Sequence, residues 1–547
     1  MTKFTSFFLL SIILLSCSEK VKYLDKEVNF NIVPLPKDVN VITPNKYIIL
    51  PKEIEVFIDN NQKKNLFDLI SNDFKKLNYS NSFELITNKN RSNLSIEIDE
   101  ELDNEEYEIN INSKIVIKGG SLSALKMARS TLLQLSVNDK GRMTFPILTL
   151  NDFPDANYRG LLIDLARQWH SVETIYKLID LASFYKVNYL QFHLTDDQLF
   201  TFPSENFPKL KTKDNHYTKK ELLSFVDYAH QRGIVIIPEI DVPGHSMQFV
   251  KKYPEIFSVA APDSKPKDFF GGKMEFANIL NIGKENVYTS LEKLFIEVME
   301  IFHTSPYFHL GADEANLKLI VDDPDIKKFM IKNNLGNDIN ELYRYFIVRM
   351  NDFFKSKGKQ MFVWEGFSRN GKIEIPKDII VFEFESLYNL PNNLVDDGYK
   401  LVNTSWLPLY IVRSGNPDPS VLPLKWGPER IYDWNMWKWE SWWHKSSAYK
   451  NPIQLDRNKN VIGAQMCSWE QTDESEIPSI RKRLPPFMER IWNFDKKDDF
   501  DVFLKKVNKT DIILSKIIKD DRQDSLLVGF NITNDGKGNP IIEVLDN

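Results

Sequence analysis

Two acidic side chains stand next to each other in the stretch YFHLGADEAN, which covers residues 307–316. Asp313 and Glu314 follow a short apolar run that is typical of a buried strand. Neighbouring side chains of a regular strand point to opposite faces, and adjacent carboxylates repel each other. A folding sequence gains little from this placement, which therefore indicates a chemical role. The structural alternative is that the pair caps the N-terminus of a following helix.

Eight apolar runs of similar length, including this one, occur between residues 153 and 495. They are YRGLLIDLAR, VNYLQFHLTDD, GIVIIPEIDVPGH, YFHLGADE, QMFVWEGF, IIVFEFES, YKLVNTSW and VIGAQMCSWEQ. Most are separated by helical patterns, such as those at 172–185, 219–231 and 287–303. Nearly continuous apolar strands that alternate with helices predict a parallel sheet covered by helices. The count of eight favours a (β/α)8 TIM barrel with insertions over a doubly wound sheet.

Several of these runs end in polar or charged residues, and in a barrel all the C-terminal strand ends meet at one face. Carboxylates that face aromatic walls suit glycoside hydrolysis, in which an acid protonates the glycosidic oxygen and a negative charge faces the oxocarbenium-like carbon. The sequence has no serine nucleophile elbow, phosphate-binding glycine loop or cysteine nucleophile signature. The residues expected to converge are Arg167, Asp196, Asp197, Glu239, Asp241, His245, Asp313, Glu314, Trp364, Glu365, Trp406, Trp469 and Glu470.

The motifs YRGLLIDLARQWH, LQFHLTDDQ, PEIDVPGH, HLGADE and VWEGF resemble those of glycoside hydrolase family 20, the β-N-acetylhexosaminidases. The resemblance runs from about residue 32 to about residue 492. It implies a substrate-assisted retaining mechanism, in which the 2-acetamido oxygen of the substrate attacks the anomeric carbon and forms an oxazolinium ion. Asp313 would orient the acetamido group and stabilise that ion, and Glu314 would act as general acid and then as base.

Further roles are implied position by position. Arg167 would grip two sugar hydroxyls with its planar fork, while the earlier Arg159 is expected to be structural. Asp196 and His245 would support the acid, and Asp241 would orient Arg167. His245 could instead be an ordinary turn residue, and either tryptophan of the expected sugar-binding walls could belong to the core. The substrate-binding candidates are Trp364, Trp406, Tyr410, Trp469 and Glu470, with Gln471 as the rival of Glu470.

The sequence departs from the family pattern at three places. Ala312 stands where glycine is commoner, and we expect no penalty from it. The sixth strand offers Phe384 in place of a tryptophan. The tyrosine that binds the acetamido oxygen normally follows the seventh-strand tryptophan, but Leu407 stands there and Tyr410 is the nearest candidate.

The N-terminus, MTKFTSFFLLSIILLSCSEK, has a positive residue followed by an apolar segment too short to span a bilayer. Residues 1–16 therefore read as a signal peptide. Cys17 lies where cleavage should occur, which resembles a bacterial lipobox and predicts lipidation, although an ordinary secretory signal is the alternative. Residues 17–30 would form the anchor and tether. We expect attachment to a bacterial membrane, with the outer membrane favoured.

The remaining segments flank the predicted barrel. Residues 31–152 mix alternating strand patterns with a helical pattern at 121–135 and predict a small α+β domain. A tryptophan-rich connection at 411–460 should form a lid or rim over one end of the barrel. Residues 496–547 read as a charged, helical tail.

Composition excludes several classes of protein. The net charge of −6 over 547 residues, without a basic stripe, argues against nucleic-acid binding. Only Cys17 and Cys467 occur, so a disulfide or a cysteine-rich zinc cluster is not expected. We expect no cofactor and no metal, and a glycan with terminal N-acetylhexosamine as the partner.

Two other functions are compatible with parts of the sequence. A catalytically inactive carbohydrate-binding lipoprotein would have no need of the Asp313–Glu314 pair. A metal-dependent hydrolase could use Asp196, His245 and Asp313, but these residues lack the spacing of a zinc motif.

Overall fold

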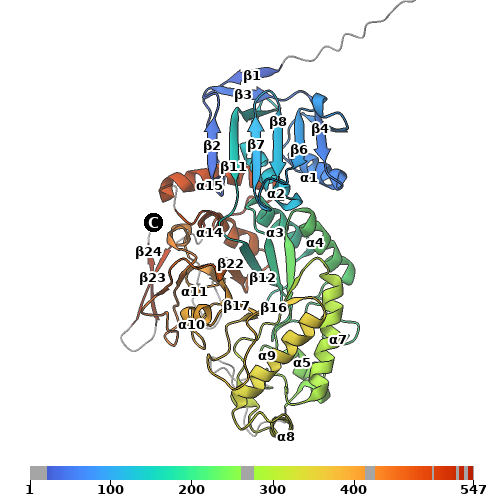
Figure 1. Cartoon of the computed structure of the whole chain (residues 1–547), viewed down its shortest axis with the longest axis vertical. Helices are drawn as coiled ribbons and strands as arrows, with labels where there is room; N and C mark the ends of the chain where they lie inside the picture. The colour runs from blue at the N-terminus through green and yellow to red at the C-terminus, as the bar shows by residue number, and fades with distance from the viewer. Residues whose placement is uncertain are drawn as a thin grey trace, which may run out of the picture.

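The computed structural model describes residues 21–259, 276–412, 426–495 and 498–524, together with the strands 529–534 and 540–545. The predicted signal segment and Cys17 lie outside these residues. Two units follow each other along the chain, a small sheet-rich domain and a larger barrel (Figure 1). Among the described residues, no helix is both long and apolar enough to cross a membrane.

The small domain is an α+β unit built on a seven-stranded sheet in the order β2-β11-β7-β8-β6-β4-β5, beside a four-stranded sheet in the order β1-β3-β10-β9. Ser121 begins α2 by accepting a hydrogen bond from the backbone N–H of Ala124, and α2 then packs against β6, β7 and β8. The elements are β1 (Lys22–Asp25), β2 (Asp38–Val41), β3 (Lys46–Ile49), β4 (Glu53–Asp59), α1 (Lys63–Lys76), β5 (Ser82–Ile86), η1 (Lys89–Arg91), β6 (Leu94–Ile98), β7 (Tyr107–Ile111), β8 (Ile115–Gly119), α2 (Leu122–Leu135), β9 (Val137–Asp139), β10 (Arg142–Pro146) and β11 (Leu148–Asp152).

Eight parallel strands close into the predicted TIM barrel. Their order is β12-β13-β14-β15-β16-β17-β18-β22, and β22 pairs with β12 to complete the ring. A short strand, β19, pairs with the end of β22. The bounds are β12 (Tyr158–Asp164), β13 (Tyr189–His193), β14 (Val235–Glu239), β15 (Tyr307–His309), β16 (Gln360–Trp364), β17 (Ile380–Glu383), β18 (Lys400–Asn403), β19 (Tyr410–Val412) and β22 (Val461–Trp469).

Helices cover the outside of most of the barrel (Figure 1). The connection from β16 to β17 is an exception, because no helix lies between these strands. The helices are α3 (Val172–Phe184), α4 (Lys219–Gln231), α5 (Met247–Lys252), α6 (Pro254–Phe257), α7 (Glu285–Ile301), η2 (Leu317–Leu319), α8 (Pro324–Lys332), α9 (Ile339–Ser356), α10 (Pro391–Asp396), α11 (Trp406–Leu409), α12 (Pro428–Asp433), α13 (Glu476–Arg481) and α14 (Leu484–Trp492).

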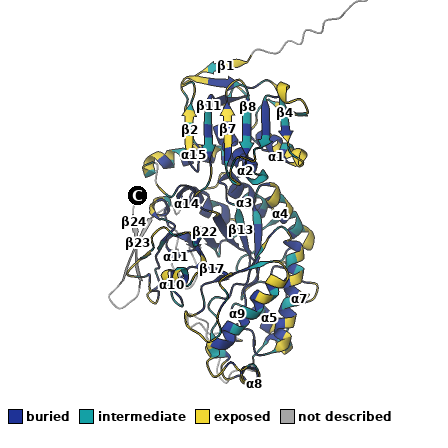
Figure 2. Cartoon of the chain, viewed as in Figure 1, coloured by how far each residue is buried: buried dark blue, intermediate teal, exposed yellow. Residues whose placement is uncertain are grey.

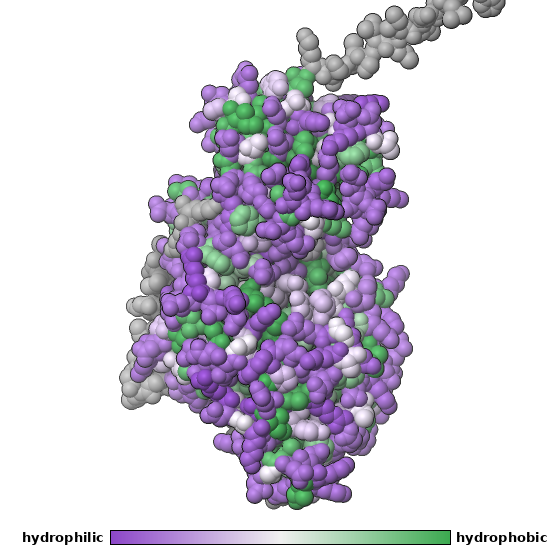
Figure 3. All heavy atoms as spheres, in the orientation of Figure 1, coloured by the Kyte–Doolittle hydropathy of each residue, from purple (hydrophilic) through white to green (hydrophobic). Residues whose placement is uncertain are grey.

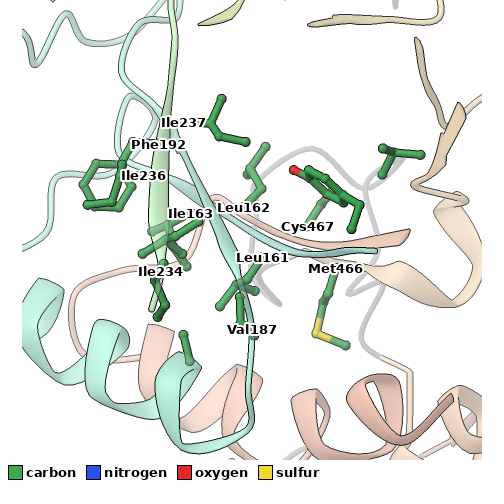
Figure 4. Close-up of a cluster of buried hydrophobic side chains, with 14 of the residues drawn as sticks. Leu161, Leu162, Ile163, Val187, Phe192, Ile234, Ile236, Ile237, Met466 and Cys467 are labelled. Atoms are coloured by element: carbon green, nitrogen blue, oxygen red, sulfur yellow. The ribbon is translucent and has the colours of Figure 1, made fainter. Parts of the chain in front are cut away.

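The barrel strands are buried along nearly their whole length, which explains why they read as continuous apolar runs (Figure 2). Figure 4 shows apolar side chains of neighbouring strands packed together, including Leu162, Phe192, Ile236 and Met466. The Cys467 thiol is buried among them. Hydrophilic residues cover most of the face in Figure 3, with apolar residues scattered between them.

The tryptophan-rich connection is hydrogen-bonded to the residues that follow β18. It contains β20 (Lys438–Trp439) and β21 (Ile453–Gln454). The backbone N–H of Leu407 donates to the carbonyl of Glu440 at 3.1 Å, and the Ser405 hydroxyl donates to the same carbonyl at 2.9 Å. Part of the connection therefore lies at the C-terminal end of the strands, where the lid was expected.

The segment after the barrel contains more than the predicted helix. The helix α15 (Phe500–Ile518) contacts α1, α2 and α3. Two further strands, β23 (Gly529–Asn534) and β24 (Pro540–Leu545), form an antiparallel pair that the sequence patterns did not indicate.

Buried charges join the small domain to the barrel. Lys186, at the start of the segment leading to β13, lies 3.0 Å from Asp152 at the end of β11, and both side chains are fully buried. The indole N–H of Trp492 donates to the same carboxylate at 2.8 Å. Arg129 of α2 donates to Asp73 at 2.6 Å and to Ser183 of α3 at 2.9 Å.

Candidate active site

The acidic pair lies on a sharp turn directly after β15. Gly311, Ala312 and Glu314 have φ angles of 76°, 70° and 45°. At Gly311 a Cβ would lie 1.8 Å from an oxygen of Asp241, so no side chain fits there. Because the chain turns out of its strand, Asp313 and Glu314 can both face the site, which a regular strand would prevent.

The geometry of this turn contradicts two interpretations of the sequence, namely that Ala312 carries no penalty and that the acidic pair caps a helix. Ala312 has a left-handed backbone, which costs a residue with a Cβ roughly 1–2 kcal/mol, so its presence is not free of penalty. The nearest helical turn, η2, has no acidic residue in its first turn. Helix capping therefore does not explain the acidic pair.

Glu314 is held through a chain of charged side chains. The His245 Nε2 atom lies 3.4 Å from a Glu314 carboxylate oxygen, and His245 Nδ1 lies 3.3 Å from Asp196. Burial lowers the pKa of His245, but the charge of Asp196 and the hydrogen bonds to Asp196 and Glu314 outweigh burial and leave its pKa well above the usual value. His245 is therefore a cation that contacts both Asp196 and Glu314, and it can stabilise the carboxylate form that Glu314 takes after giving up a proton.

Asp313 has a separate support. It is hydrogen-bonded to Asp241, and burial, with Glu314 nearby, raises the pKa of Asp313 to about 6. Burial and the charge of Asp313 also raise the pKa of Asp241 well above its usual value. Asp241 thus keeps its proton and can donate it to Asp313 in a hydrogen bond. Among the described residues, Asp313 Oδ1 has no hydrogen-bond partner.

Arg167 forms ion pairs with two other carboxylates. Its guanidinium lies 2.8 Å from Asp196 and 3.3 Å from Asp164, the last residue of β12. It also lies over the ring of Trp469 at 5.0 Å. We expected Asp241 to orient Arg167, but the carboxyls that pair with Arg167 are Asp196 and Asp164, whereas Asp241 accepts the backbone N–H of Ala312 at 3.1 Å and binds Asp313. Asp241 fixes the turn of the acidic pair instead.

Four aromatic side chains form a closed ring beside these carboxylates. The ring-to-ring distances are 5.7 Å from Trp364 to Phe384, 6.2 Å from Phe384 to Tyr410, 5.8 Å from Tyr410 to Trp469 and 5.9 Å from Trp469 to Trp364. The Phe384 and Tyr410 rings are nearly parallel, at 4°. Phe384, Tyr410 and the two tryptophans therefore come together from four different strand ends.

Trp406 lies behind this ring. Its indole is 6.2 Å from Phe384 and 5.5 Å from Tyr410, and its exposed fraction is only 7%. On its other side it stacks on Trp442 of the tryptophan-rich connection at 5.1 Å and 18°. Trp406 therefore links the aromatic ring to the tryptophan-rich connection, and its direct contact with the sugar stays a prediction.

The choice between Glu470 and Gln471 follows from their hydrogen bonds. Gln471 is fully buried and donates to the carbonyls of Ile411 and Trp469, each at 3.1 Å. Glu470 has a φ of 58°, and its charge contributes to the raised pKa of Arg167. Glu470 is therefore the residue of the two that faces the site.

The sequence patterns did not predict several polar residues of the site. Asp164 follows an apolar run and could have been recognised as a strand end. His193 lies inside an apolar run and carried no separate signal. Two further buried acids, Glu383 and Glu385, lie at the end of β17 and two residues beyond it, and the expected Glu365 directly follows β16. Burial raises their pKa values, to about 7 for Glu365 and well above the usual range for the other two.

Three groups of side chains in the described part of the chain bring potential metal ligands within 4.8 Å of one another. They are His193–Glu239–Asp241, Asp196–Asp197–His245 and Asp241–His245–Asp313. Many of these atoms already contact each other, since His245 binds Asp196 and Asp313 binds Asp241. A mechanism without metal stays a prediction.

Comparison with known proteins places this geometry in a family. Residues 157–494 match the model of the catalytic domain of glycosyl hydrolase family 20, and residues 29–153 match domain 2 of that family. The chain is 27% identical over 412 residues to the human beta-hexosaminidase subunit beta, covering 73% of this chain and 68% of that one.

Solved structures agree with the family models. A chitobiase from Flavobacterium johnsoniae is 27% identical, with a TM-score of 0.71, and the alignment covers 89% of this chain and 73% of that one. A beta-N-acetylhexosaminidase from Bacteroides fragilis is 21% identical, with a TM-score of 0.73, and the alignment covers 89% and 96%. The family models together span most of the chain, and the chain belongs to glycosyl hydrolase family 20.

Proposed function

We propose that this protein is a β-N-acetylhexosaminidase that removes terminal β-linked N-acetylhexosamine from glycans, with the acetamido group of the substrate as the nucleophile. Family membership supports the glycosidase activity. The observation that carries the mechanism is the separate support of two adjacent carboxyls. Glu314 lies against the cationic His245, whereas Asp313 is bound to the protonated Asp241. Neighbouring acids can therefore do different work in one reaction.

In the first step, Glu314 gives its proton to the glycosidic oxygen while the acetamido oxygen attacks the anomeric carbon. The glycosidic C–O bond breaks, the sugar becomes a cyclic oxazolinium ion, and the aglycone leaves as an alcohol. In the second step, water attacks the anomeric carbon and gives a proton to the Glu314 carboxylate. The C–O bond to the acetamido oxygen breaks, and the sugar keeps its β configuration.

Asp313 orients the acetamido group and opposes the charge of the oxazolinium ion. Its Oδ1 atom, which has no hydrogen-bond partner among the described residues, is free to accept the acetamido N–H. The ring of Trp364, Phe384, Tyr410 and Trp469 encloses the acetamido methyl group, and the Tyr410 hydroxyl binds the acetamido oxygen. The apolar walls strengthen these charge interactions because they exclude water.

A hydrolysis screen tests this function. The protein is incubated with N-acetylglucosaminides, N-acetylgalactosaminides and matched glucosides, and the products are identified. Release of a terminal N-acetylated sugar with retained β configuration is expected, and addition of EDTA should not change the rate. Brisk cleavage of plain glucosides would contradict acetamido participation. Binding of N-acetylated sugars without hydrolysis would identify a carbohydrate-binding lipoprotein instead.

Arg167 binds the non-reducing end of the sugar, and its substitution gives the first test of an individual residue. We expect Arg167→Lys to lower kcat/KM by at least tenfold, because an ammonium cannot form the paired hydrogen bonds of a planar guanidinium. Asp164 and Asp196 hold the guanidinium at fixed angles, so retained charge alone is not enough.

Steady-state kinetics on a nitrophenyl N-acetylglucosaminide provides the measurement. Arg159→Lys is a matched control, because Arg159 lies at the other end of β12 and binds Glu105 of the small domain at 2.7 Å. A kcat/KM of Arg167→Lys within twofold of the wild type would refute the sugar-binding role.

Lipid attachment at Cys17 is proposed from the sequence pattern. Two or three acyl chains would hold the protein firmly, since each buried methylene contributes about 0.8 kcal/mol. In a diderm bacterium, the wild type should sediment with the membranes, the outer membrane first among them. Cys17→Ala should release the activity into the soluble fraction or block processing of the precursor. Equal membrane retention of both forms would argue for another means of attachment.

A further inference from the structure

Glu239, the last residue of β14, is a fully buried carboxylate. One of its oxygens accepts the indole N–H of Trp364 at 2.6 Å. The other lies 2.7 Å from His193 Nδ1 and accepts the side-chain amide of Gln191 at 2.9 Å. A buried carboxylate is expensive unless it is paired, and this one is bound on both oxygens.

His193 carries the connection towards the acidic pair. Its other nitrogen, Nε2, lies 3.0 Å from Asp196, whose second oxygen lies 3.3 Å from His245. Burial lowers the pKa of His193, but Glu239 and Asp196 raise it well above the usual value. Burial raises the pKa of Glu239, but the charge of His193 and the hydrogen bonds from His193 and Gln191 bring it down to about 2. The pair is therefore a carboxylate and an imidazolium.

The neighbouring His309 does not share this charge. Its Nδ1 accepts the backbone N–H of Gly311 at 3.0 Å, which requires an unprotonated nitrogen there. Burial lowers the pKa of His309 to about 4, despite the Glu239 oxygen at 3.4 Å. The positive charge that faces Glu239 therefore lies on His193.

We propose that Glu239 is a positioning residue that sets the pocket wall and the acid together: one oxygen fixes Trp364, and the other holds His193 as an imidazolium against the Asp196–His245 pair behind Glu314. This inference rests on the proposed function. One oxygen of Glu239 would thereby position the aromatic ring around the substrate. The other oxygen would act, through His193, on the residues that support the proton donor Glu314.

The substitution Glu239→Gln removes the negative charge of the side chain but nearly keeps its size and shape. An amide can accept the Trp364 N–H with its oxygen, but its NH2 group then faces His193. The bond can persist only if His193 loses its Nδ1 proton, so the histidine becomes neutral. Asp196 then keeps a hydrogen bond but loses a cationic partner, and the support of Glu314 is displaced. Misplacement of such groups by about 1 Å can cost on the order of 100-fold in rate.

The experiment combines spectroscopy with kinetics. The side-chain 15N signals of His193, assigned with His193→Gln, should show an imidazolium at pH 7 in the wild type and a neutral ring in Glu239→Gln. The value of kcat/KM should fall about 100-fold for a methyl glycoside, whose leaving group needs the acid, and less for an acidic phenol. Glu476→Gln is the control, because Glu476 is an equally buried acid that lies 3.0 Å from the Nε2 atom of a different histidine, His170.

The contact of Glu239 with Trp364 and its contact with His193 can also be tested separately if Glu239→Gln does not fold. Trp364→Phe should lower kcat/KM by a similar factor for all leaving groups, whereas His193→Gln should penalise poor leaving groups more. An imidazolium retained in Glu239→Gln, or kcat/KM within twofold of the wild type, would overturn the proposal. The proposal would also be overturned if kcat/KM depended on the leaving group in the same way in Trp364→Phe and His193→Gln. If the wild type cleaves no N-acetylhexosaminide, the proposed function fails, while the 15N signals still decide the Glu239–His193 link.

Discussion

Glu314→Gln should almost abolish hydrolysis of substrates with a poor leaving group and spare much of the hydrolysis of substrates with an acidic one. The glutamine keeps the size of Glu314 but cannot donate a proton to the glycosidic oxygen. General acid help is typically worth roughly 10²–10⁴-fold, and an alkoxide leaving group needs all of it. A dinitrophenolate leaves with little protonation, so the first step should survive.

The measurement is kcat/KM for methyl, nitrophenyl and dinitrophenyl N-acetylglucosaminides, for the wild type and the variant. The slope of log kcat/KM against the pKa of the leaving group should become much steeper in Glu314→Gln. His245→Gln serves as a comparison, because it leaves the acid in place and removes only its partner at 3.4 Å. A parallel drop for all three substrates in Glu314→Gln would rule out Glu314 as the acid.

Asp313→Asn should cost activity without this dependence on the leaving group. The asparagine removes the negative charge that faces the oxazolinium ion, and the acid stays intact. Burial, together with Glu314, raises the pKa of Asp313 to about 6. The carboxylate needed for catalysis therefore forms as the pH rises through about 6. The wild type should lose activity below that pH, and this acid limb should be missing from the weak residual activity of Asp313→Asn.

A second measurement addresses the intermediate directly. A thiazoline analogue of the cyclised sugar should inhibit the wild type much more strongly than Asp313→Asn, because it mimics the charged species that Asp313 stabilises. An unchanged acid limb in the variant would assign that limb to another carboxyl. A covalent glycosyl adduct trapped on any carboxylate of the protein would contradict the whole substrate-assisted scheme.

The barrel and the acidic pair could be predicted because both leave local signals in the sequence. Strands buried on both faces must be apolar throughout, so β12, β13 and β14 stand out as runs. A carboxylate pair after such a run contributes little to folding, which indicates a chemical role for Asp313 and Glu314. Arg167 and His245 were predicted by family resemblance, and the structure brings both to the same barrel face.

The partners of these residues could not be predicted, because they depend on which strands are neighbours in space. Asp241 contacts Ala312 since β14 lies beside β15, and nothing in the spacing of 71 residues indicates this. The contact of Arg167 with Asp196 has the same origin, because β12 lies beside β13, whereas its contact with Asp164 is local. Phe384 and Tyr410 approach each other only because their separate strand ends meet on one rim.

The buried ion pairs between the two domains bear on how this chain folds. Lys186 and Asp152 belong to different units, and both side chains are fully buried where the units meet. Removing one partner of such a buried pair typically costs about 3–5 kcal/mol, because the other charge is left without compensation. We therefore expect each unit to be stabilised by its contact with the other, and the two units to unfold together.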